Sequence, residues 1–463
     1  MNLNLPFDLR PFGSREIARA APFAEEPDLR PELGQRLRRF LIVAIVATVP
    51  LNSVSGDKGA AAAVNLSLAD AFLPLGVLFL AWLLMKGRLR LPMLLLCLLN
   101  ISTVALSILL NLEGSVVGRG ALAIGLEIAK LGCLWLLFYL FVNCIQSRSD
   151  FCLLMKAWIL GSVAESLCGI VGSLLYQMAG IETPLALQFR AEGTMGDSNI
   201  FAAHLGAAFF LTFVYRRLVQ PARPWTFFAM AVQLAGIYFS ASRGGLLSLV
   251  ATLLFLWLFA TSGKQRIAGA LVGLGVAILI ASMPSQDAFV ASNPMTERLK
   301  TTTVSLNDPE AQQRARLWRV AFAGFLSSPI IGIGRGNYVS LESTDPDGAG
   351  HAHNTLLGIL CDTGLLGLAG YVAFGLAVIL GLVRDWLGHP NRERRIVDGI
   401  LLGVLLTVGL SGMTINIENY RGLWILLAVV VAYQRIYLAP VSAKFAKVPA
   451  VAVARISQFG FPR

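Results

Sequence analysis

The chain has 463 residues, of which 56% are hydrophobic and only 14% are charged, and its mean hydropathy is +0.68. About a quarter of the residues of a soluble domain are charged, so the composition excludes that class and indicates a polytopic membrane protein. The formal net charge of +11 does not require a nucleic-acid partner, because basic residues anchored at the inner leaflet account for it.

The first 38 residues are polar and rich in arginine, and an apolar run begins at Phe40. This lead is too long and too polar for a cleaved signal peptide, so we expect a cytoplasmic tail. Six cysteines lie in or beside apolar runs and none lies in the long polar loop, so no disulfide framework is expected. They are Cys97, Cys133, Cys144, Cys152, Cys168 and Cys361.

Twelve apolar runs alternate with short polar segments. A helix needs roughly 20 apolar residues to cross the hydrocarbon core, so we predict an all-α polytopic membrane protein with about 12 transmembrane helices. The seventh run is short for a span. The predicted spans are 39–56, 66–85, 91–111, 120–143, 152–178, 198–215, 225–240, 244–262, 267–284, 354–383, 396–414 and 421–438.

Lysine and arginine decide the orientation. If the N-terminus is inside, the short inner loops are consistently basic, so both termini should be cytoplasmic. The predicted organisation is a tail at 1–38, spans 1–9 over 39–284, a long outer loop at 285–353, spans 10–12 over 354–438 and a second tail at 439–463.

Arginines on the outer side run against the insertion bias and need another explanation. Their rigid fork of donors suits phosphate oxygens, and several converging at the outer face would suit a lipid-linked diphosphate. A single outer arginine is better explained by a carboxylate partner or by water. For Arg190, Arg243 and Arg316 together we favour a functional role, because each lies in a motif-like setting.

The first setting is FRAEGTMGDSNIFAAH, residues 189–204. Arg190 lies in an outer loop whose end, at Asp197 and Asn199, can cap the following helix. Capping is the first interpretation of these two residues, although a helix N-terminus at the outer face would also favour an anion. We expect His204, one turn into the span, to be buried and hydrogen-bonded.

The second setting is YFSASRGGLLSLV, residues 238–250, in which two glycines follow Arg243. A helix break or re-entry is expected here, and small residues also let helices approach closely in lipid. A charge between two apolar runs is costly unless it is paired or faces a wet cavity. Arg243 is therefore a stronger functional candidate than an arginine in a loop.

The third setting is the long outer loop. Its stretch NDPEAQQRARLWRVAFAGFLSSP predicts a helix with Asp308 as N-cap and Pro309 at the first position. Aromatic residues at helical spacing predict an amphipathic helix that lies over the membrane domain, with two arginines near its apolar boundary. These are Trp318, Phe322 and Phe325, and Arg316 and Arg319. Arg335 follows in the glycine-rich turn SSPIIGIGRGNY, which lacks the strand–turn–helix unit of a nucleotide site.

The loop ends in HAHNTLLGILCDTGLLG, residues 351–367, where His351 and His353 precede an apolar stretch. Histidine is the side chain most readily poised to move a proton near neutral pH, so these two are candidate catalytic groups at the membrane surface. We expect Asn354 to cap the tenth span. We also expect Glu127 and Lys130, three residues apart, to pair. No metal-ligand motif is present, so no metal is expected.

With these residues in place, the chain resembles the superfamily of O-antigen ligases and Wzy-type polysaccharide polymerases over roughly residues 40–435. The long outer loop between spans 9 and 10 and the order of the motifs both fit, and the last motif is the most specific. The matching pieces are Arg190 with GTMGDSN, SASRGG around Arg243, RLW from Arg316, SSPIIGIGRGNY, and HAHNTLLGILCDTGLLG.

The resemblance implies a glycosyltransferase of the bacterial inner membrane that uses glycans on undecaprenyl diphosphate at the periplasmic face. An acceptor hydroxyl attacks the anomeric carbon and the lipid diphosphate leaves, without a cofactor or metal if arginines neutralise the leaving group. The resemblance makes His353 the candidate base, supported by His351. Arg243 and Arg316 are the leading diphosphate contacts, followed by Arg190 and Arg335. Arg319, Asn199 and Asn354 complete the expected substrate site.

Three acceptors remain open: another lipid-linked repeat unit for a polymerase, lipid A–core for a ligase, or a protein. We lean towards a polymerase of exopolysaccharide or O-antigen. A polysaccharide or lipid transporter or flippase is the rival class, but it should show broken helices in paired repeats around a midplane site. A structural partner of other polysaccharide assembly proteins is a third alternative, in which the histidine and arginines would be replaceable.

Overall fold

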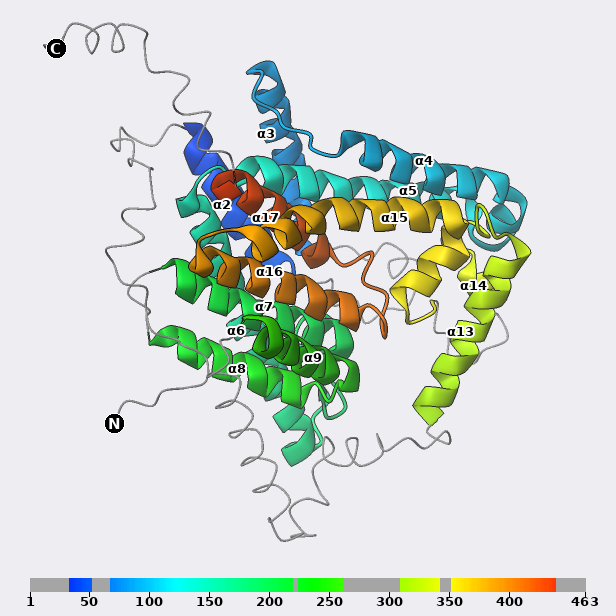
Figure 1. The fold of residues 1–463 in the computed structure, drawn as a ribbon. Helices are drawn as coiled ribbons and strands as arrows, with labels where there is room; N and C mark the ends of the chain where they lie inside the picture. Colours follow the sequence, from blue (N-terminus) through cyan, green and yellow to red (C-terminus); the bar gives the residue numbers. More distant parts are fainter. Residues whose placement is uncertain (1–32, 52–66, 220–223, 261–308, 342–350, 439–463) are drawn as a thin grey trace, which may run out of the picture.

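The computed structural model describes residues 33–51, 67–219, 224–260, 309–341 and 351–438. In these ranges the chain is almost entirely helical and has one small two-stranded sheet (Figure 1). The elements are α2 (Leu33–Thr48), η1 (Leu68–Phe72), α3 (Leu73–Met85), α4 (Leu94–Leu110), α5 (Leu112–Cys144), α6 (Arg148–Ala179), β1 (Ala186–Leu187), β2 (Arg190–Ala191), α7 (Ser198–Leu218), α8 (Trp225–Phe239), α9 (Arg243–Ala260), α13 (Pro309–Ser327), α14 (Tyr338–Leu341), α15 (Thr355–Gly388), α16 (Arg392–Ser411) and α17 (Arg421–Leu438).

The all-α membrane class is confirmed at the level of helices. Five described helices are long and apolar enough to cross a membrane, and α4, α8 and α9 are shorter apolar helices. Leucines on the outer faces of these helices, such as Leu78 and Leu95, are largely exposed, as expected where the neighbour is lipid. The predicted ninth span, the predicted N-cap Asp308, the loop residues 285–308 and 342–350 and nearly all of both tails lie outside the described residues.

Helix α7 forms the centre of the molecule, between α6, α8, α9 and α16. It is buried on nearly all sides because small residues let its neighbours approach, as the Cβ that alanine would add at Gly206 lies 2.9 Å from Thr407. Its ends are fixed by charge: Asp197 caps the first turn, and Arg216 and Arg217 lie in the last turn.

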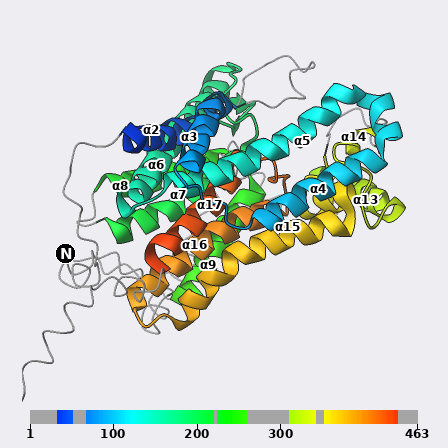
Figure 2. The same ribbon diagram turned by 90° about the horizontal axis from the view of Figure 1, so that it is seen from above.

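A second group consists of α4, α5 and α15, which run side by side towards α13 and α14 (Figure 2). The predicted pair on α5 is present, with Lys130 Nζ 3.1 Å from Glu127 Oε1. The guanidinium of Arg421 donates two hydrogen bonds to the carboxylate of Asp70, which ties α17 to η1. All six cysteines are free thiols.

The tenth predicted span is not one continuous helix. Gly364 in α15 has φ +64° and ψ −165°, so a short segment at 355–363 is followed by a longer one. The glycine-rich turn at 329–336 inserts into this break and supplies the backbone partners that the helix lacks there. The four bonds run from Ile333 N to Cys361 O at 3.0 Å, Gly334 N to Asp362 O at 3.1 Å, Leu365 N to Pro329 O at 2.9 Å and Leu366 N to Ile330 O at 3.1 Å.

The helix predicted in the long outer loop is confirmed as α13, but the face that it packs with was predicted wrongly. Trp318 and Phe322 are 40% and 48% exposed, whereas Leu317 and Ala321 are buried and α13 contacts α15. Small residues pack here: a Cβ added at Gly324 would lie 2.7 Å from Cys361 Sγ. In a membrane protein an aromatic face need not point inward, because lipid is itself an apolar partner.

Candidate functional site

The loop between α6 and α7 is built on a buried carboxylate. Glu165 on α6 accepts hydrogen bonds from the backbone N (2.9 Å) and the hydroxyl (2.7 Å) of Thr194. Gly193 has φ +57°, and a Cβ there would lie 2.4 Å from Glu165 Oε2, so this close approach requires glycine. The strands β1 and β2 pair just before it and place Arg190 opposite Leu187.

Arg190 reaches across to the start of α9. Its Nε donates to the carbonyl of Ser240 at 3.3 Å and its Nη2 donates to Asn199 Oδ1 at 3.4 Å. The hydroxyl of Ser242 donates to the same Asn199 oxygen at 2.8 Å. Capping of α7 was the first interpretation of Asn199, but its side chain instead links two of the predicted motifs. The capping prediction is confirmed for Asp197, whose Oδ1 accepts from the backbone N of Asn199 at 2.7 Å.

Arg243 is the first residue of α9, directly after the turn that contains Ser242. The predicted close approach of helices is confirmed at Gly245, where a Cβ would lie 2.4 Å from the Cβ of Ala202 on α7. Arg190 and Arg243 lie close enough for their positive charges to interact. Two of the predicted arginines are thus brought together at one end of α7 and α9.

His353 lies in the loop that leads into α15, and its backbone is strained, with φ +47°. Such a conformation is rare for a residue with a side chain and concentrates at functional sites. The ring of His351 lies 4.6 Å from the ring of His353. Between them, Ala352 is buried in a small apolar cluster with Leu317 and Ala321 of α13, which holds the loop in place.

Asn354 caps α15, as predicted: its Oδ1 accepts from the backbone N of Leu357 at 3.1 Å. Its own backbone N donates to Asn416 Oδ1 at 2.9 Å, and the backbone N of Thr355 donates to the Gly412 carbonyl at 2.8 Å. The start of α15 is therefore fixed to the loop between α16 and α17, and the histidines lie directly before a rigid helix end.

Helix α13 contributes an arginine that the sequence did not single out. Arg314 lies one turn before the buried Leu317, and its charge acts on His353. Arg316 and Arg319 have exposed side chains, and Arg319 Nε donates to the carbonyl of Ala315 at 3.2 Å. Helical spacing explains why Arg314 differs from Arg316 and Arg319, since positions 314, 317 and 321 share the buried face of α13.

Burial and nearby charges shift the pKa values of three groups in the candidate site. Burial, the neighbouring His351 and the charge of Arg314 lower the pKa of His353 to about 4, against an opposing effect of Asp197. Burial and the negative charge of Asp197 raise the pKa of Glu192 to about 7. Burial is also the first cause of a lowered pKa at Arg190. Asp197 acts on all three groups, so the loop before α7 lies within electrostatic range of His353.

This arrangement can bind an anion and accept a proton. His353 is neutral at pH 7 and so has a free ring nitrogen to receive a proton. Arg314 places positive charge near His353, and Arg190 and Arg243 place it near Asp197, so a phosphate group there would be stabilised by charge-assisted hydrogen bonds. In the described part of the chain, no three His, Cys, Asp or Glu residues are grouped so as to hold a metal ion.

Arg335 belongs to a different, buried network. It is 6% exposed, and its donors contact Glu127 (3.4 Å), Tyr371 (3.1 Å) and Asn419 (2.5 Å). These partners come from α5, α15 and the loop before α17. His204, as expected, is buried, with its Nδ1 2.5 Å from the hydroxyl of Tyr420.

Sequence reasoning missed Glu192 and Arg314, and it did not separate a structural role from a functional role for Glu165. The signal for Glu192 was its place in the same loop as Arg190 and Asp197. Arg314 lies three residues before Leu317, so a face defined by small and aliphatic residues would have revealed it. Glu165 and Thr194 are 29 residues apart in the sequence, so no local pattern indicates their contact.

Two comparisons with known proteins bear on this site. A family model described as O-antigen ligase (Wzy_C) matches residues 228–372, which include Arg243, Arg314 and His353 but not Arg190. The teichuronic acid biosynthesis protein TuaE of Bacillus subtilis (strain 168) is 22% identical over 334 residues, or 67% of this chain and 67% of that protein. Both matches confirm the predicted resemblance to the O-antigen ligase superfamily.

Proposed function

Starting from the resemblance to the O-antigen ligase superfamily, we propose that the chain is a membrane glycosyltransferase that polymerises or ligates surface polysaccharide. Its donor is a glycan on undecaprenyl diphosphate, and it acts at the periplasmic face of the bacterial inner membrane. The observation that carries the proposal is the strained, neutral His353, on which Arg314 and Asp197 act, together with Arg190 and Arg243, which lie close to each other near the same Asp197.

His353 acts as the base. Its neutral ring nitrogen takes the proton of an acceptor hydroxyl as the hydroxyl oxygen forms a bond to the anomeric carbon of the donor. The bond between that carbon and the phosphate oxygen breaks, and its electron pair leaves on undecaprenyl diphosphate. The proton on His353 then returns to solvent or to the departing diphosphate, which restores the neutral ring.

The arginines stabilise the leaving group. Arg190 and Arg243 are already close enough to repel each other, and the charge of Arg314 acts on His353. Bringing a diphosphate between these charges relieves their repulsion and supplies the counter-charge that developing oxyanions need. The same negative charge would raise the pKa of His353 from about 4 towards its ordinary value, where a histidine is a stronger base.

The other predicted residues take different parts in this proposal. Arg314 replaces Arg316 as the leading α13 contact, while Arg316 and Arg319 are assigned to the outer part of the donor because their side chains are exposed. Arg335 is assigned a positioning role, since its three buried partners already engage its guanidinium. His351, Asn199 and Asn354 orient His353 and Arg190.

For the acceptor we favour another lipid-linked repeat unit over lipid A–core. The relative whose name refers to teichuronic acid biosynthesis supports the assembly of a polymer other than lipopolysaccharide. The runner-up, ligation to lipid A–core, uses the same donor chemistry and the same residues.

A glycan profile tests the proposal. Surface polysaccharide and lipopolysaccharide of a deletion strain are compared with those of strains that carry the wild-type gene. Single repeat units without long chains identify a polymerase, and long chains left on the lipid carrier with bare lipid A–core identify a ligase. An unchanged profile for both polymers contradicts the proposal and favours the transporter or the assembly partner.

A further inference from the structure

A cavity of about 360 Å³ lies at the other end of the molecule from the candidate site. Helix α6 relates the two: it begins beside the cavity at Arg148 and ends at Ala179, before the loop that carries Arg190. Its 32 residues rise about 48 Å, so the two places lie at opposite ends of a membrane-spanning helix. The cavity is lined by Gly87, Arg88, Leu89, Arg90 and Gln146, and we call it the α3–α4 pocket.

The backbone of the α3–α4 pocket is fixed by two devices. Helix α3 ends at Met85 and is followed by Gly87, with φ +63°; the backbone N of Arg88 donates to the Leu83 carbonyl at 2.9 Å, which turns the chain sharply. Two residues later, Asn143 clamps Arg90: its Oδ1 accepts from Arg90 N at 2.9 Å and its Nδ2 donates to Arg90 O at 2.8 Å. Both arginine side chains are exposed and start from a rigid backbone.

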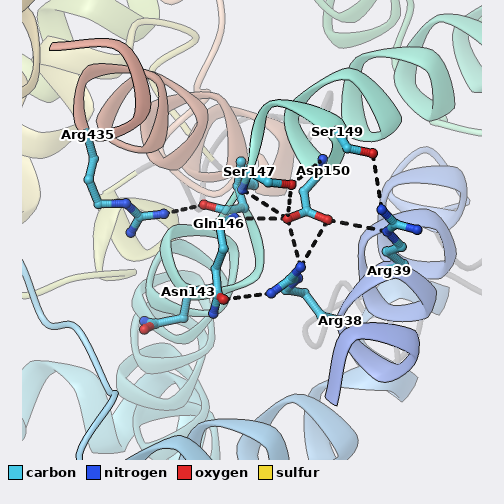
Figure 3. A network of polar contacts seen from close by, with 9 residues as sticks. Arg38, Arg39, Asn143, Gln146, Ser147, Ser149, Asp150 and Arg435 are labelled. Carbon is cyan, nitrogen blue, oxygen red and sulfur yellow. Dashed lines mark hydrogen bonds and ion pairs between the residues drawn. The ribbon is translucent and has the colours of Figure 1, made fainter. Parts of the chain in front are cut away.

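Beside the pocket lies a network of arginines around Asp150 (Figure 3). Arg38 lies 3.0 Å and Arg39 lies 3.5 Å from the carboxylate of Asp150, whose side chain is fully buried. Arg38 also donates to the side chain of Gln146 at 2.6 Å, and Gln146 donates to the Asn143 carbonyl at 2.9 Å. The wall of the pocket at Gln146 is therefore held from both sides.

Positive charge exceeds negative charge in this region. Arg435 at the end of α17 donates to the backbone carbonyls of Val142 (2.9 Å) and Ile145 rather than to a carboxylate, and Arg90 is near enough for the two charges to repel. Among the described residues, the ion pairs of this cluster contain one carboxylate, Asp150. The surplus favours an anion at Arg88 and Arg90.

The surroundings of the pocket are apolar. Leu84 and Met85 at the end of α3 are 65% and 79% exposed, and Leu95 at the start of α4 is 78% exposed. In a membrane these side chains lie against acyl chains. A ligand that reaches the arginines from this side has an anionic head and an apolar body.

We propose that the α3–α4 pocket binds the phosphate headgroup of an anionic lipid, with Arg88 and Arg90 at the phosphate and the acyl chains along the exposed leucines of α3 and α4. Diffuse attraction to an anionic leaflet needs only nearby charge. A bound lipid needs a cavity with fixed walls, which Asn143 and Gln146 provide. The proposal does not depend on the reaction at His353.

The test measures binding of short-chain phosphatidylglycerol to the purified full chain in detergent, by native mass spectrometry and by thermal stabilisation. Phosphatidylcholine of the same chain length and inorganic phosphate are the comparison probes. The variant R88Q/R90Q should bind phosphatidylglycerol about thirty-fold more weakly, the change expected for two lost arginine contacts to a phosphate headgroup. The matched control R384Q/R392Q removes the same charge from exposed arginines on α15 and α16 and should bind as the wild type does.

Three results would overturn the proposal. If both double variants bind phosphatidylglycerol equally weakly, the attraction is diffuse. If phosphatidylcholine binds as tightly as phosphatidylglycerol, the pocket does not select for an anionic headgroup. Competition by inorganic phosphate as strong as that by the lipid identifies a free phosphate site. If R88Q/R90Q does not accumulate, R88K/R90K replaces it. That variant keeps the charge but loses the planar fork, so several-fold weaker binding supports the pocket and unchanged binding contradicts it.

Discussion

Glu192 offers a direct probe of the electrostatics beside His353. Its carboxyl lies among Arg190 and Asp197 in the loop before α7, and burial together with the charge of Asp197 raises its pKa from 4.5 to about 7. Between these two pH values the folded protein holds a proton that the unfolded chain has released. The contribution of Glu192 to stability therefore falls as the pH rises from 4.5 to 7, and the substitution Glu192→Gln removes this loss.

The size of the effect follows from the two pKa values. A carboxyl with a folded-state pKa near 7 costs at most about 3 kcal/mol of stability once it is ionised in both states. Glutamine keeps an oxygen that can accept the hydrogen bond from the backbone N of Ser198, so little is lost at low pH. Above pH 7 the variant should be more stable than the wild type, and it should bind an anionic donor more tightly because Arg190 has lost a competing charge.

The assay is thermal unfolding of the purified protein in detergent at pH values from 4.5 to 8.5, with Glu182→Gln as the matched control. Glu182 is an exposed carboxylate in the same loop between α6 and α7. The opposite contribution of His353 is common to all three proteins, so the difference between them isolates Glu192. We expect the curves of the wild type and the control to coincide, and Glu192→Gln to gain stability relative to both as the pH rises from 4.5 to 7. Parallel curves for all three proteins would refute the reasoning, because the titration would then not belong to Glu192.

Three further changes test the site and its support. Arg314→Gln removes a positive charge that lowers the pKa of His353, so the acid limb of kcat/KM should move to higher pH; an unchanged limb contradicts the placement of Arg314. Arg243→Lys should lower kcat/KM about a hundredfold because an ammonium lacks the planar fork, while the exposed Arg384→Lys should have no effect; equal activity would reduce Arg243 to a generic charge. Gly364→Ala places a Cβ 2.4 Å from the Ile330 backbone at a positive φ and should prevent accumulation, whereas Gly375→Ala, with open space around it, should not; two normal proteins would disprove the inserted turn.

Much of the helical fold follows from hydropathy alone. Within the described residues, apolar runs long enough to span a bilayer are helices, and the caps at Asp197 and Asn354 and the start of α9 at Arg243 were readable from local sequence. These features depend on neighbouring residues, so a local pattern contains the information that determines them.

The break in α15 could not be read in this way. Glycine at 364 permits the conformation, but the hydrogen bonds that stabilise it come from residues 329–336, about thirty positions earlier. The buried face of α13 was predicted wrongly for a similar reason. Both of its faces are partly apolar, and the aromatic one can lie against lipid. Only packing against α15 determines which face is buried, and this choice also directs Arg314 rather than Arg316 to His353.

The site was partly predictable because its motifs are local, but their assembly is not. The sequence marked Arg190, Arg243 and His353 as candidates. In the folded chain Asn199 links Arg190 to Ser242 beside Arg243, and the charge of Asp197 acts on His353. Arg335 carried the same kind of motif signal, yet its partners lie in a separate buried network. A motif identifies a residue with a special backbone or charge requirement. The tertiary contacts decide whether that residue belongs to the candidate site or to a buried network.

The most direct test is transfer by the purified protein from a fluorescent glycan on undecaprenyl diphosphate to an unlabelled lipid-linked repeat unit, followed as release of undecaprenyl diphosphate. The wild type should release the lipid diphosphate and lengthen the glycan. His353→Ala should remain folded, bind the donor and release at least a hundredfold less. Release at the wild-type rate by His353→Ala would contradict the central claim that His353 is the base at this site.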